Sequence, residues 1–366
     1  MSAEVAAGIR RVGVVGAGVM GSGIAQWMAA RGFDVVLRDA QPAALGRAAE
    51  VMRGLFAGAV ARRKMSEAEA AAGLQRLATT TGWDGFDTCD LVIEAIIEEV
   101  GAKRRVFSEI AAVVRPDAIV ASNTSALPIE EFAGHVPYPE RTLGLHFFNP
   151  VSRMALVELV VTPHTAPAVR DRVRDFARAL GKHPVTCRST PGFLVTRVLF
   201  FYLNEAVRLW EQGGDLSAID GALRAFGWPM GPLRLIDEVG VDVTDFIFGE
   251  LAHYYPGRFA GTTACGRLVA AGLLGRKNGA SRGFYRYGPE GETANDLETR
   301  ALQAVVGVRP APEPAAYLME IMVAEARRCM AEGVVAAAAD VDDALRLGAG
   351  FPLSRGGLLA WADGAK

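Results

Sequence analysis

Residues 11–25 read RVGVVGAGVMGSGIA, a short apolar run that passes into a glycine-rich turn and then into a helical pattern. The turn has the spacing G-x-G-x-x-G, formed by Gly16, Gly18 and Gly21. Between a strand and a helix, the first glycine permits a tight turn and the second lets the backbone approach a pyrophosphate, while the third lets helix pack on strand. Phosphates bind well at such a helix N-terminus, because free N–H groups favour negative charge there. The stretch therefore predicts a dinucleotide-binding unit.

An acid at the end of the second predicted strand favours one coenzyme. Asp39 follows the run DVVLR, 18 residues after Gly21. A carboxylate there accepts hydrogen bonds from the ribose hydroxyls and repels a 2′-phosphate, so the sequence predicts NAD rather than NADP. The neighbouring Arg38 counts against this preference, because an arginine can accommodate a 2′-phosphate. The alternative interpretation of the whole motif is a glycine-rich turn that binds no ligand.

Outward from this unit, short β-rich runs alternate with longer helical patterns through the first half of the chain. This alternation predicts the Rossmann-type α/β class, with a mostly parallel, doubly wound sheet. The predicted strands are 11–16, 34–38, 90–95, 118–122, 142–147, 155–161 and 183–187, and the predicted helices are 20–31, 41–64, 100–114 and 166–180.

The second half of the chain is predicted to be helical. Pro191-Gly192 marks the boundary, and residues 193–212 carry apolar side chains at helical spacing. The segment 310–314, PAPEP, is typical of a linker, and a final helical block follows it.

The two helical blocks resemble each other. Asp220 and Leu223 in the first block have the same spacing as Asp342 and Leu345 in the second. This similarity predicts a tandem duplication with a short second copy. The predicted domains are an NAD-binding Rossmann domain at 1–190, an all-α C-terminal domain at 191–309, and a shortened second helical repeat at 310–366.

A histidine and a glutamate in consecutive predicted strands are candidates for acid–base chemistry. His146 lies at the carboxyl end of its strand, where ligands bind in doubly wound sheets. Glu158 follows in the next apolar run, where a carboxylate is costly unless it is paired. A His–Glu pair would satisfy that carboxylate, fix the imidazole tautomer and raise its basicity. On spacing alone, a core histidine bonded to a backbone carbonyl is an equally good interpretation.

Polar residues also follow two other predicted strands. The run 122–125, SNTS, offers hydroxyl and amide donors beside the same crevice, and Glu98 and Lys103 flank the start of a helix. From sequence alone the simpler interpretations are favoured, namely a polar loop that caps a helix and a solvated helix face.

Composition excludes several classes of function. The 366 residues carry 39 Lys and Arg against 41 Asp and Glu, a net charge of −2, which argues against a nucleic-acid-coating protein. No apolar run approaches the roughly 20 residues that span a bilayer, and the N-terminus has no apolar core typical of a signal peptide. The four cysteines lie far apart and none is in a C-x-x-C pair. We therefore expect no metal site, and reduced thiols in a cytoplasmic protein.

Taken together, these residues resemble the 3-hydroxyacyl-CoA dehydrogenase family over nearly the whole chain. The motifs that carry the resemblance, besides the glycine-rich turn, are LVIEAIIEE, ASNTSAL, LGLHFFNPVSRMALVELV, STPGFLVTRVLF, FGWPMGP, and GRKNG followed by GFYRYG. The pattern HFFNPV-x-x-M-x-L-V-E is far more specific than a generic Rossmann match. The tandem repeat is most similar to the dehydrogenase portion of multifunctional fatty-acid oxidation enzymes. We expect no hydratase domain, because only about ten residues precede the first strand.

The resemblance implies NAD-dependent oxidation of 3-hydroxyacyl-CoA to 3-ketoacyl-CoA in fatty-acid or related acyl-CoA metabolism. It implies that His146 is the catalytic base, that Glu158 is its partner, and that Ser125 contacts the substrate oxygen and the cofactor. Arg62 and Lys64 match a segment that helps hold the CoA phosphates in relatives, although a solvated charge run is an equally good interpretation. The implied cofactor-binding residues are Gly16, Gly18, Val19, Met20, Gly21, Asp39, Glu98, Lys103, Asn123, Ser125, Asn149 and Lys277.

Two departures from the family pattern bear on activity. Thr196 stands where the family usually has an asparagine that assists at the substrate oxygen, and its hydroxyl donates a hydrogen bond over a shorter reach. Three residues, 280–282, separate GRKNG from GFYRYG, where the family usually has one, so the connection after Lys277 is longer.

Two other functions stay open. The chain could be a dehydrogenase of a 3-hydroxy acid without CoA, similar to gulonate dehydrogenases, or a non-catalytic NAD-binding fragment. Intact Gly16, Asp39, His146 and Glu158 argue against the fragment. The expected partners are an acyl-CoA substrate and either a second copy of the chain or a separate hydratase or thiolase, and no nucleic acid is expected.

Overall fold

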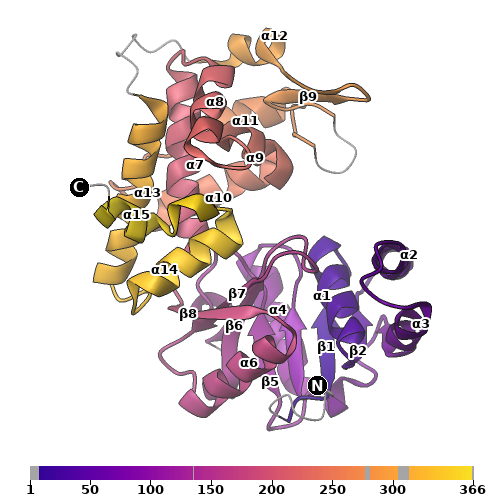
Figure 1. Cartoon of the computed structure of the whole chain (residues 1–366). Helices are drawn as coiled ribbons and strands as arrows, with labels where there is room; N and C mark the ends of the chain where they lie inside the picture. Colours follow the sequence, from indigo (N-terminus) through magenta and orange to yellow (C-terminus); the bar gives the residue numbers. More distant parts are fainter. Residues whose placement is uncertain (1–7, 135, 277–280, 304–312, 365–366) are drawn as a thin grey trace. The chain divides into compact units, whose positions relative to one another are not determined.

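The computed structural model describes residues 8–134, 136–276, 281–303 and 313–364. The chain forms two compact units that divide between Thr190 and Pro191 (Figure 1).

The first unit is built on an eight-stranded sheet in the order β3-β2-β1-β4-β5-β6-β7-β8. Neighbouring strands are parallel except β6 and β7, which are antiparallel. The strands are β1 (Arg11–Val15), β2 (Asp34–Arg38), β3 (Leu77–Thr80), β4 (Leu91–Glu94), β5 (Ile119–Ser122), β6 (Thr142–Phe147), β7 (Leu156–Val161) and β8 (His183–Arg188). The prediction of a mostly parallel, doubly wound sheet is confirmed.

Strand β3 and the helix before it, α3 (Glu67–Gln75), were not predicted from the sequence. Strand β3 is a short edge strand without buried residues, so it has no apolar run to mark it. Helix α3 begins with a capping box formed by Ser66 and Glu69, and the S-x-x-E spacing is a signal that could have revealed it.

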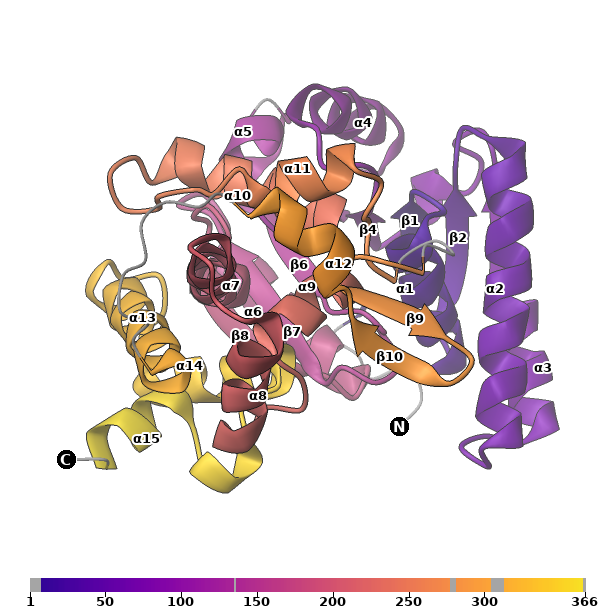
Figure 2. The ribbon, with the colours of Figure 1, turned by 90° about the horizontal axis from the view of Figure 1, so that it is seen from above.

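The helices of the first unit cover the sheet and bury its apolar residues. Helices α2 and α3 pack beside α1 (Figure 2). The helices are α1 (Val19–Ala30), α2 (Pro42–Ala61), α3 (Glu67–Gln75), α4 (Val100–Val113), α5 (Glu130–Ala133) and α6 (Pro167–Ala179). Central strand residues such as Val14, Ile93 and Leu145 are fully buried in this core.

The described residues of the second unit are helical apart from one hairpin. Its helices are α7 (Val195–Glu211), α8 (Leu216–Phe226), α9 (Pro232–Val239), α10 (Val241–Tyr254), α11 (Ala264–Ala270), α12 (Asp296–Thr299), α13 (Pro314–Ala331), α14 (Ala338–Ala344) and α15 (Leu358–Gly364). The hairpin of β9 (Tyr285–Gly288) and β10 (Gly291–Ala294) was not predicted. The Tyr285 and Tyr287 hydroxyls anchor it by donating to the buried Asp220 and Asp237 over 2.7 Å each.

The second repeat reproduces the local structure of the first. Both carboxylate oxygens of Asp220, in α8, accept backbone N–H groups at the start of α9 at 2.9 Å. Both oxygens of Asp342, in α14, accept N–H groups at the start of α15 at 2.7 and 3.2 Å. Asp220 and Asp342 are therefore equivalent aspartates that stabilise equivalent helix–helix connections.

The two predicted repeats pack on each other through α7 and α13. Helix α13 runs alongside α7 (Figure 1). Arg197 of α7 donates to Glu325 of α13 at 2.6 Å, and Tyr317 of α13 donates to Glu205 of α7 at 2.6 Å. Glu205 and Glu325 are equivalent, because each begins one of the repeated Glu-Ala pairs. Arg197 precedes Glu205 by the same number of residues as Tyr317 precedes Glu325, so these two positions are equivalent as well. Such an exchange of contacts is characteristic of an isologous interface.

A glycine in the second repeat tests the importance of the aspartate connection. A Cβ added to Gly357 would lie 2.2 Å from Asp342 Cγ, so Gly357→Ala should lower the free energy of unfolding by about 2–3 kcal/mol through overpacking and lost hydrogen bonds. Gly221→Ala is the matched control, because its Cβ would meet nothing within 4 Å and alanine favours helix. Urea unfolding measures both, and equal stabilities would contradict the prediction.

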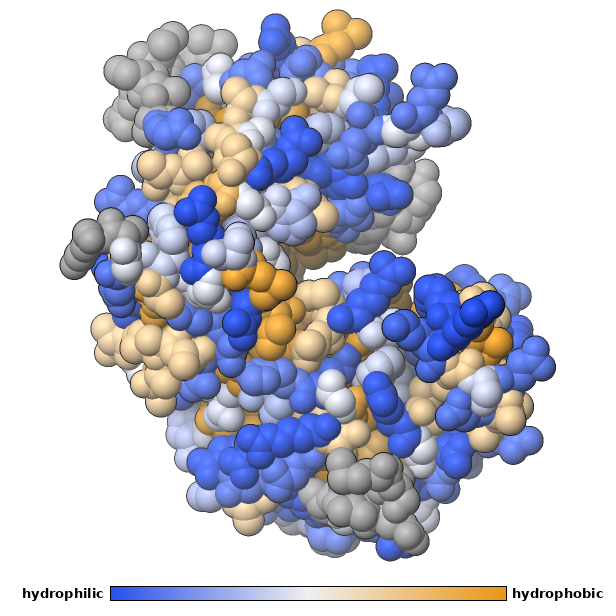
Figure 3. All heavy atoms as spheres, in the orientation of Figure 1, coloured by the Kyte–Doolittle hydropathy of each residue, from blue (hydrophilic) through white to orange (hydrophobic). Residues whose placement is uncertain are grey.

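The surface is largely polar on the face shown in Figure 3. The face seen in Figure 3 is mostly hydrophilic, with hydrophobic residues in smaller patches. In the part of the chain that the structure describes, no helix combines the length and the hydropathy that crossing a membrane requires.

Candidate active site

The glycine-rich turn after β1 has the geometry of a phosphate cradle. Gly16 has φ +106°, and an added Cβ would lie 2.5 Å from the Ala95 carbonyl oxygen. A Cβ on Gly21 would lie 1.8 Å from the Gly16 oxygen. At Gly18, by contrast, a Cβ would meet no protein atom within 4 Å, so open space lies beside that backbone. Packing thus requires the first and third glycines, while the second leaves room for a pyrophosphate.

The N-terminus of α1 is suited to an anion. The helix begins at Val19, its cap is Gly18, and its first turn has neither a side-chain cap nor an acidic residue. The helix dipole is therefore not offset by a carboxylate of the first turn. These residues fit the phosphates of a dinucleotide.

Asp39 links this turn to the next helix. Its Oδ2 accepts the Ala17 N–H and its Oδ1 accepts the Gln41 N–H, both at 2.9 Å. A carboxylate has about four acceptor positions, so further positions remain for ribose hydroxyls. The role of Asp39 at the coenzyme ribose stays a prediction.

The two kinds of glycine should respond differently to alanine. Gly18→Ala should keep the stability of the wild type but weaken NADH binding at least tenfold, because the methyl group enters the phosphate space. Gly21→Ala should lower the free energy of unfolding by about 2–3 kcal/mol, because its Cβ cannot fit beside Gly16. Calorimetric titration with NADH and urea unfolding separate the two effects. Wild-type NADH affinity in Gly18→Ala would contradict this assignment of the cradle.

His146 and Glu158 are brought together by strand pairing. They lie directly opposite each other in the antiparallel pair β6–β7, and His146 Nδ1 lies 2.7 Å from Glu158 Oε2. His146 is 6% exposed and Glu158 is 0% exposed. A carboxylate at Nδ1 favours the tautomer with the proton on Nδ1, which makes Nε2 the basic nitrogen. The predicted contact is present, and the arrangement can act as a general base.

A buried lysine, missed by sequence analysis, supports the loop after His146. The Lys182 ammonium donates to the carbonyl oxygens of Val151 and Met154, the second at 2.7 Å, and lies 4.5 Å from the Trp27 ring centroid. Burial, together with the nearby Arg31, lowers the pKa of Lys182 to about 8. A lysine after a helix-terminating glycine resembles a surface residue, so no local signal revealed this role.

The lowered pKa of Lys182 predicts a stability change at alkaline pH. Between pH 8 and the ordinary lysine pKa near 10.4, the unfolded chain binds this proton more tightly than the folded chain, so stability rises with pH. Relative to Lys182→Met, the wild type should gain roughly 1–2 kcal/mol between pH 7 and 9.5. Urea unfolding at both pH values measures the gain, and a constant difference between the two proteins would contradict the prediction.

A charged network joins the carboxyl ends of β4 and β5. Glu94 accepts hydrogen bonds from Lys103 Nζ at 2.8 Å and from Ser122 Oγ at 2.6 Å. Lys103 Nζ also pairs with Glu98 at 3.2 Å, and Glu98 Oε1 accepts the Ser125 N–H at 2.7 Å and its hydroxyl at 3.1 Å. The network thus sets the position and direction of the Ser125 side chain.

Electrostatics favour the charged forms of Glu98 and Lys103. Burial opposes charge on Glu98, but the Lys103 ammonium and the bonds from Ser125 and Thr124 outweigh it and lower the pKa of Glu98. Burial likewise opposes charge on Lys103, but Glu94 and Glu98 outweigh it and raise the pKa of Lys103. Glu94 was missed, although a carboxylate inside the apolar run LVIEA carries the signal that revealed Glu158.

The other predicted site residues occupy varied environments. Asn123 is buried and its Oδ1 accepts the Phe147 N–H at 2.9 Å, which supports the strand that carries His146. Asn149 is exposed in the loop after β6, and Arg62 and Lys64 are exposed just beyond α2. Thr196 is buried in the first turn of α7 in the second unit. Lys277 lies outside the described residues.

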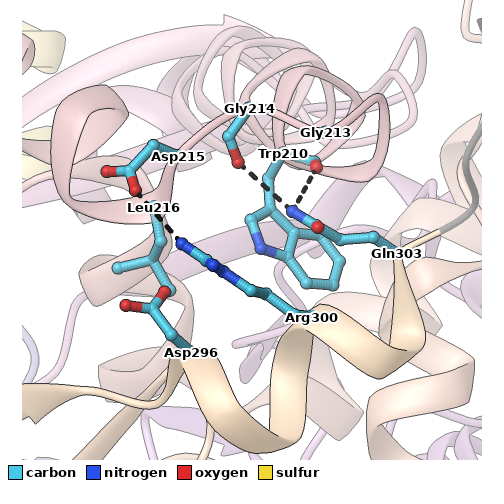
Figure 4. A pocket seen from close by; sticks show the side chains of 8 residues that line it. All are labelled: Trp210, Gly213, Gly214, Asp215, Leu216, Asp296, Arg300 and Gln303. Atoms are coloured by element: carbon cyan, nitrogen blue, oxygen red, sulfur yellow. Dashed lines mark hydrogen bonds and ion pairs between the residues drawn. The ribbon is translucent and has the colours of Figure 1, made fainter.

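A polar hollow of about 320 Å³ lies elsewhere, beside the end of α7 (Figure 4). None of the predicted site residues lines it. Its lining residues are Trp210, Gly213, Gly214, Asp215, Leu216, Asp296, Arg300 and Gln303. Among the residues that the structure describes, no cluster of three or more His, Cys, Asp or Glu is arranged to hold a metal.

Comparisons with known proteins agree with this geometry. The NAD binding domain of 3-hydroxyacyl-CoA dehydrogenase matches residues 11–190, and the C-terminal domain of the same family matches residues 192–287.

Among solved structures, 3-hydroxybutyryl-CoA dehydrogenase from Escherichia coli K12 is 29% identical with a TM-score of 0.82, and the match covers 98% of this chain and 92% of that one. FadB2 from M. tuberculosis is 40% identical with a TM-score of 0.74, covering 76% and 99%. (S)-3-hydroxybutyryl-CoA dehydrogenase PaaH1 from Ralstonia eutropha is 35% identical with a TM-score of 0.72, covering 76% and 99%.

Proposed function

Because the chain belongs to the 3-hydroxyacyl-CoA dehydrogenase family, we propose that it interconverts (S)-3-hydroxyacyl-CoA and 3-ketoacyl-CoA with His146 and Glu158 as the catalytic pair. The observation that carries this proposal is the 2.7 Å contact between His146 Nδ1 and Glu158 Oε2 at the carboxyl end of β6. Ligands bind at these strand ends in doubly wound sheets.

In the oxidation, His146 Nε2 takes the proton of the 3-hydroxyl group, and Glu158 stabilises the imidazolium that forms. NAD held at the turn of Gly16, Gly18 and Gly21 would supply the acceptor for the hydride from C3. The Ser125 hydroxyl donates a hydrogen bond to Glu98 Oε1 at 3.1 Å, which orients the Ser125 side chain.

The proposed substrate class is a short-chain acyl thioester, because two of the similar structures are named 3-hydroxybutyryl-CoA dehydrogenases. Arg62 and Lys64, exposed beyond α2, are proposed to contact the CoA phosphates. A cytoplasmic location is proposed as well, since Cys89, Cys265 and Cys329 form no disulfide.

We propose that the chain is monomeric. The symmetric contacts between α7 and α13 occupy, within one chain, the kind of isologous interface that otherwise joins two copies. Sedimentation velocity distinguishes the states, and a dimer at micromolar concentration would contradict this part of the proposal.

The decisive experiment is the consumption of NADH with acetoacetyl-CoA, measured beside NADPH and beside free acetoacetate. Rapid loss of NADH with the thioester alone would support the reaction, the coenzyme and the need for CoA together. Turnover of free acetoacetate at a similar rate would favour a hydroxy acid without CoA. NADH binding without any turnover would contradict the proposal and direct attention to Thr196.

A further inference from the structure

Arg38 is a cation beside the carboxylate that recognises the coenzyme ribose, yet its guanidinium is held by other groups. Its Cζ lies 3.9 Å from the ring centroid of Trp83. Its Nε donates to the Gly82 carbonyl oxygen at 3.1 Å, and its Nη2 pairs with Glu109 Oε2 at 3.3 Å. The side chain of Arg38 is only 13% exposed. The guanidinium is therefore stacked, hydrogen-bonded and paired at the same time.

Trp83, on whose ring Arg38 stacks, is itself anchored in the core. The Trp83 ring packs edge-on against Phe86, with centroids 5.1 Å apart. Phe86 is fully buried against β1, where a Cβ on Gly13 would lie 2.5 Å from its ring. The loop that carries Trp83 follows Thr80, which pairs with Arg38 in the register of β2 and β3. Trp83 thus has little freedom to release the arginine.

We propose that Trp83, the Gly82 carbonyl and Glu109 withhold Arg38 from the 2′ position of the coenzyme, and so determine the preference for NAD over NADP together with Asp39. A 2′-phosphate would place roughly two negative charges beside Asp39. Arg38 would not neutralise them, because its guanidinium is already held by Trp83, Gly82 and Glu109. Glu109 satisfies the guanidinium charge that a phosphate would otherwise attract. The preference for NAD over NADP is therefore set both by Asp39 and by the contact of Arg38 with Glu109, which lies 71 positions away in the sequence.

This inference rests on the coenzyme site of the proposed function, and not on its acyl substrate. It can therefore be tested by coenzyme binding alone. The suitable background is Asp39→Asn, which removes the repulsive charge and keeps the size of the side chain. In that background, Trp83→Ala with Glu109→Gln releases Arg38, and a further Arg38→Ala removes the released cation.

Calorimetric titration of each variant with NADH and NADPH is the measurement. Releasing Arg38 should tighten NADPH binding about tenfold relative to Asp39→Asn alone, and the added Arg38→Ala should abolish that gain. Tenfold corresponds to about 1.4 kcal/mol, close to the value of a hydrogen bond to a charged group. NADH binding should change less than about threefold, because it has no 2′-phosphate.

A second variant keeps the test valid if the loss of Trp83 harms folding, as thermal unfolding would reveal. Glu109 is half exposed on α4, so Asp39→Asn with Glu109→Gln should fold normally and tighten NADPH binding by a smaller, Arg38-dependent factor of about three. No Arg38-dependent gain in either series would overturn the inference. If the wild type binds NADH but does not turn over acetoacetyl-CoA, the proposed function is contradicted, whereas this inference about Arg38 is not.

Discussion

Replacing His146 by glutamine should lower kcat for acetoacetyl-CoA reduction by about a thousandfold or more. Proton transfer by a positioned group contributes typically 10²–10⁴-fold, and glutamine cannot exchange a proton at neutral pH. The side chain lies opposite Glu158 at a strand end and is 6% exposed, so a residue of similar size should leave the sheet intact. Steady-state kinetics measures the loss, and calorimetry with NADH should give an affinity close to that of the wild type.

The matched control is His164→Gln. This histidine is exposed in the turn after β7 and lies outside the candidate site, so its replacement should leave kcat unchanged. If His146→Gln keeps more than a tenth of the wild-type turnover, another group is the base and the catalytic pair is wrongly assigned.

Replacing Lys103 by methionine should lower the free energy of unfolding by roughly 3–5 kcal/mol, because removing one partner of a buried ion pair leaves an uncompensated charge. The ammonium is 1% exposed and pairs with Glu94, which is fully buried, and with Glu98. Urea unfolding measures the loss. We also expect kcat/KM to fall, because Glu98 orients Ser125 through this network.

Arg105→Met is the control for Lys103→Met on the same helix. Its side chain is 72% exposed and pairs with Glu99 only at 4.0 Å, so its loss should cost less than about 0.5 kcal/mol. A loss below about 1 kcal/mol in Lys103→Met would contradict the stabilising role assigned to this buried contact. The pKa of Glu98 is lowered in the fold, so the ionised Glu98 side chain contributes to stability at neutral pH. This stability is lost progressively as the pH falls below about 4.3.

The sheet could be predicted because its central strands are apolar runs flanked by helical patterns. Each of the seven predicted strands has buried residues, on both faces in every case but β8, and β3, which has none, was missed. The hairpin of β9 and β10 was missed because only the buried carboxylates Asp220 and Asp237, far away in sequence, show why Tyr285 and Tyr287 are needed.

The site was predicted where chemistry depends on local spacing. The glycine-rich turn, Asp39 and the strand-end His146 are each marked by a pattern of neighbouring residues. The pairing of His146 with Glu158 could be anticipated because a carboxylate in an apolar run needs a partner. Glu94 carries the same signal as Glu158 but was not predicted. The role of Lys182 could not be assigned, because its bonding partners lie in another segment of the chain.

The sequence by itself determined the doubly wound sheet, the dinucleotide turn and the candidate acid–base residues, since these follow from the period of apolar residues and from the backbone freedom of glycine. Only the tertiary structure decided what the charged side chains do. Arg38 is directed to Trp83 and Glu109, and Lys103 is buried between two glutamates. Such choices depend on which charges and rings the folded chain places within a few ångströms, and no local spacing encodes them.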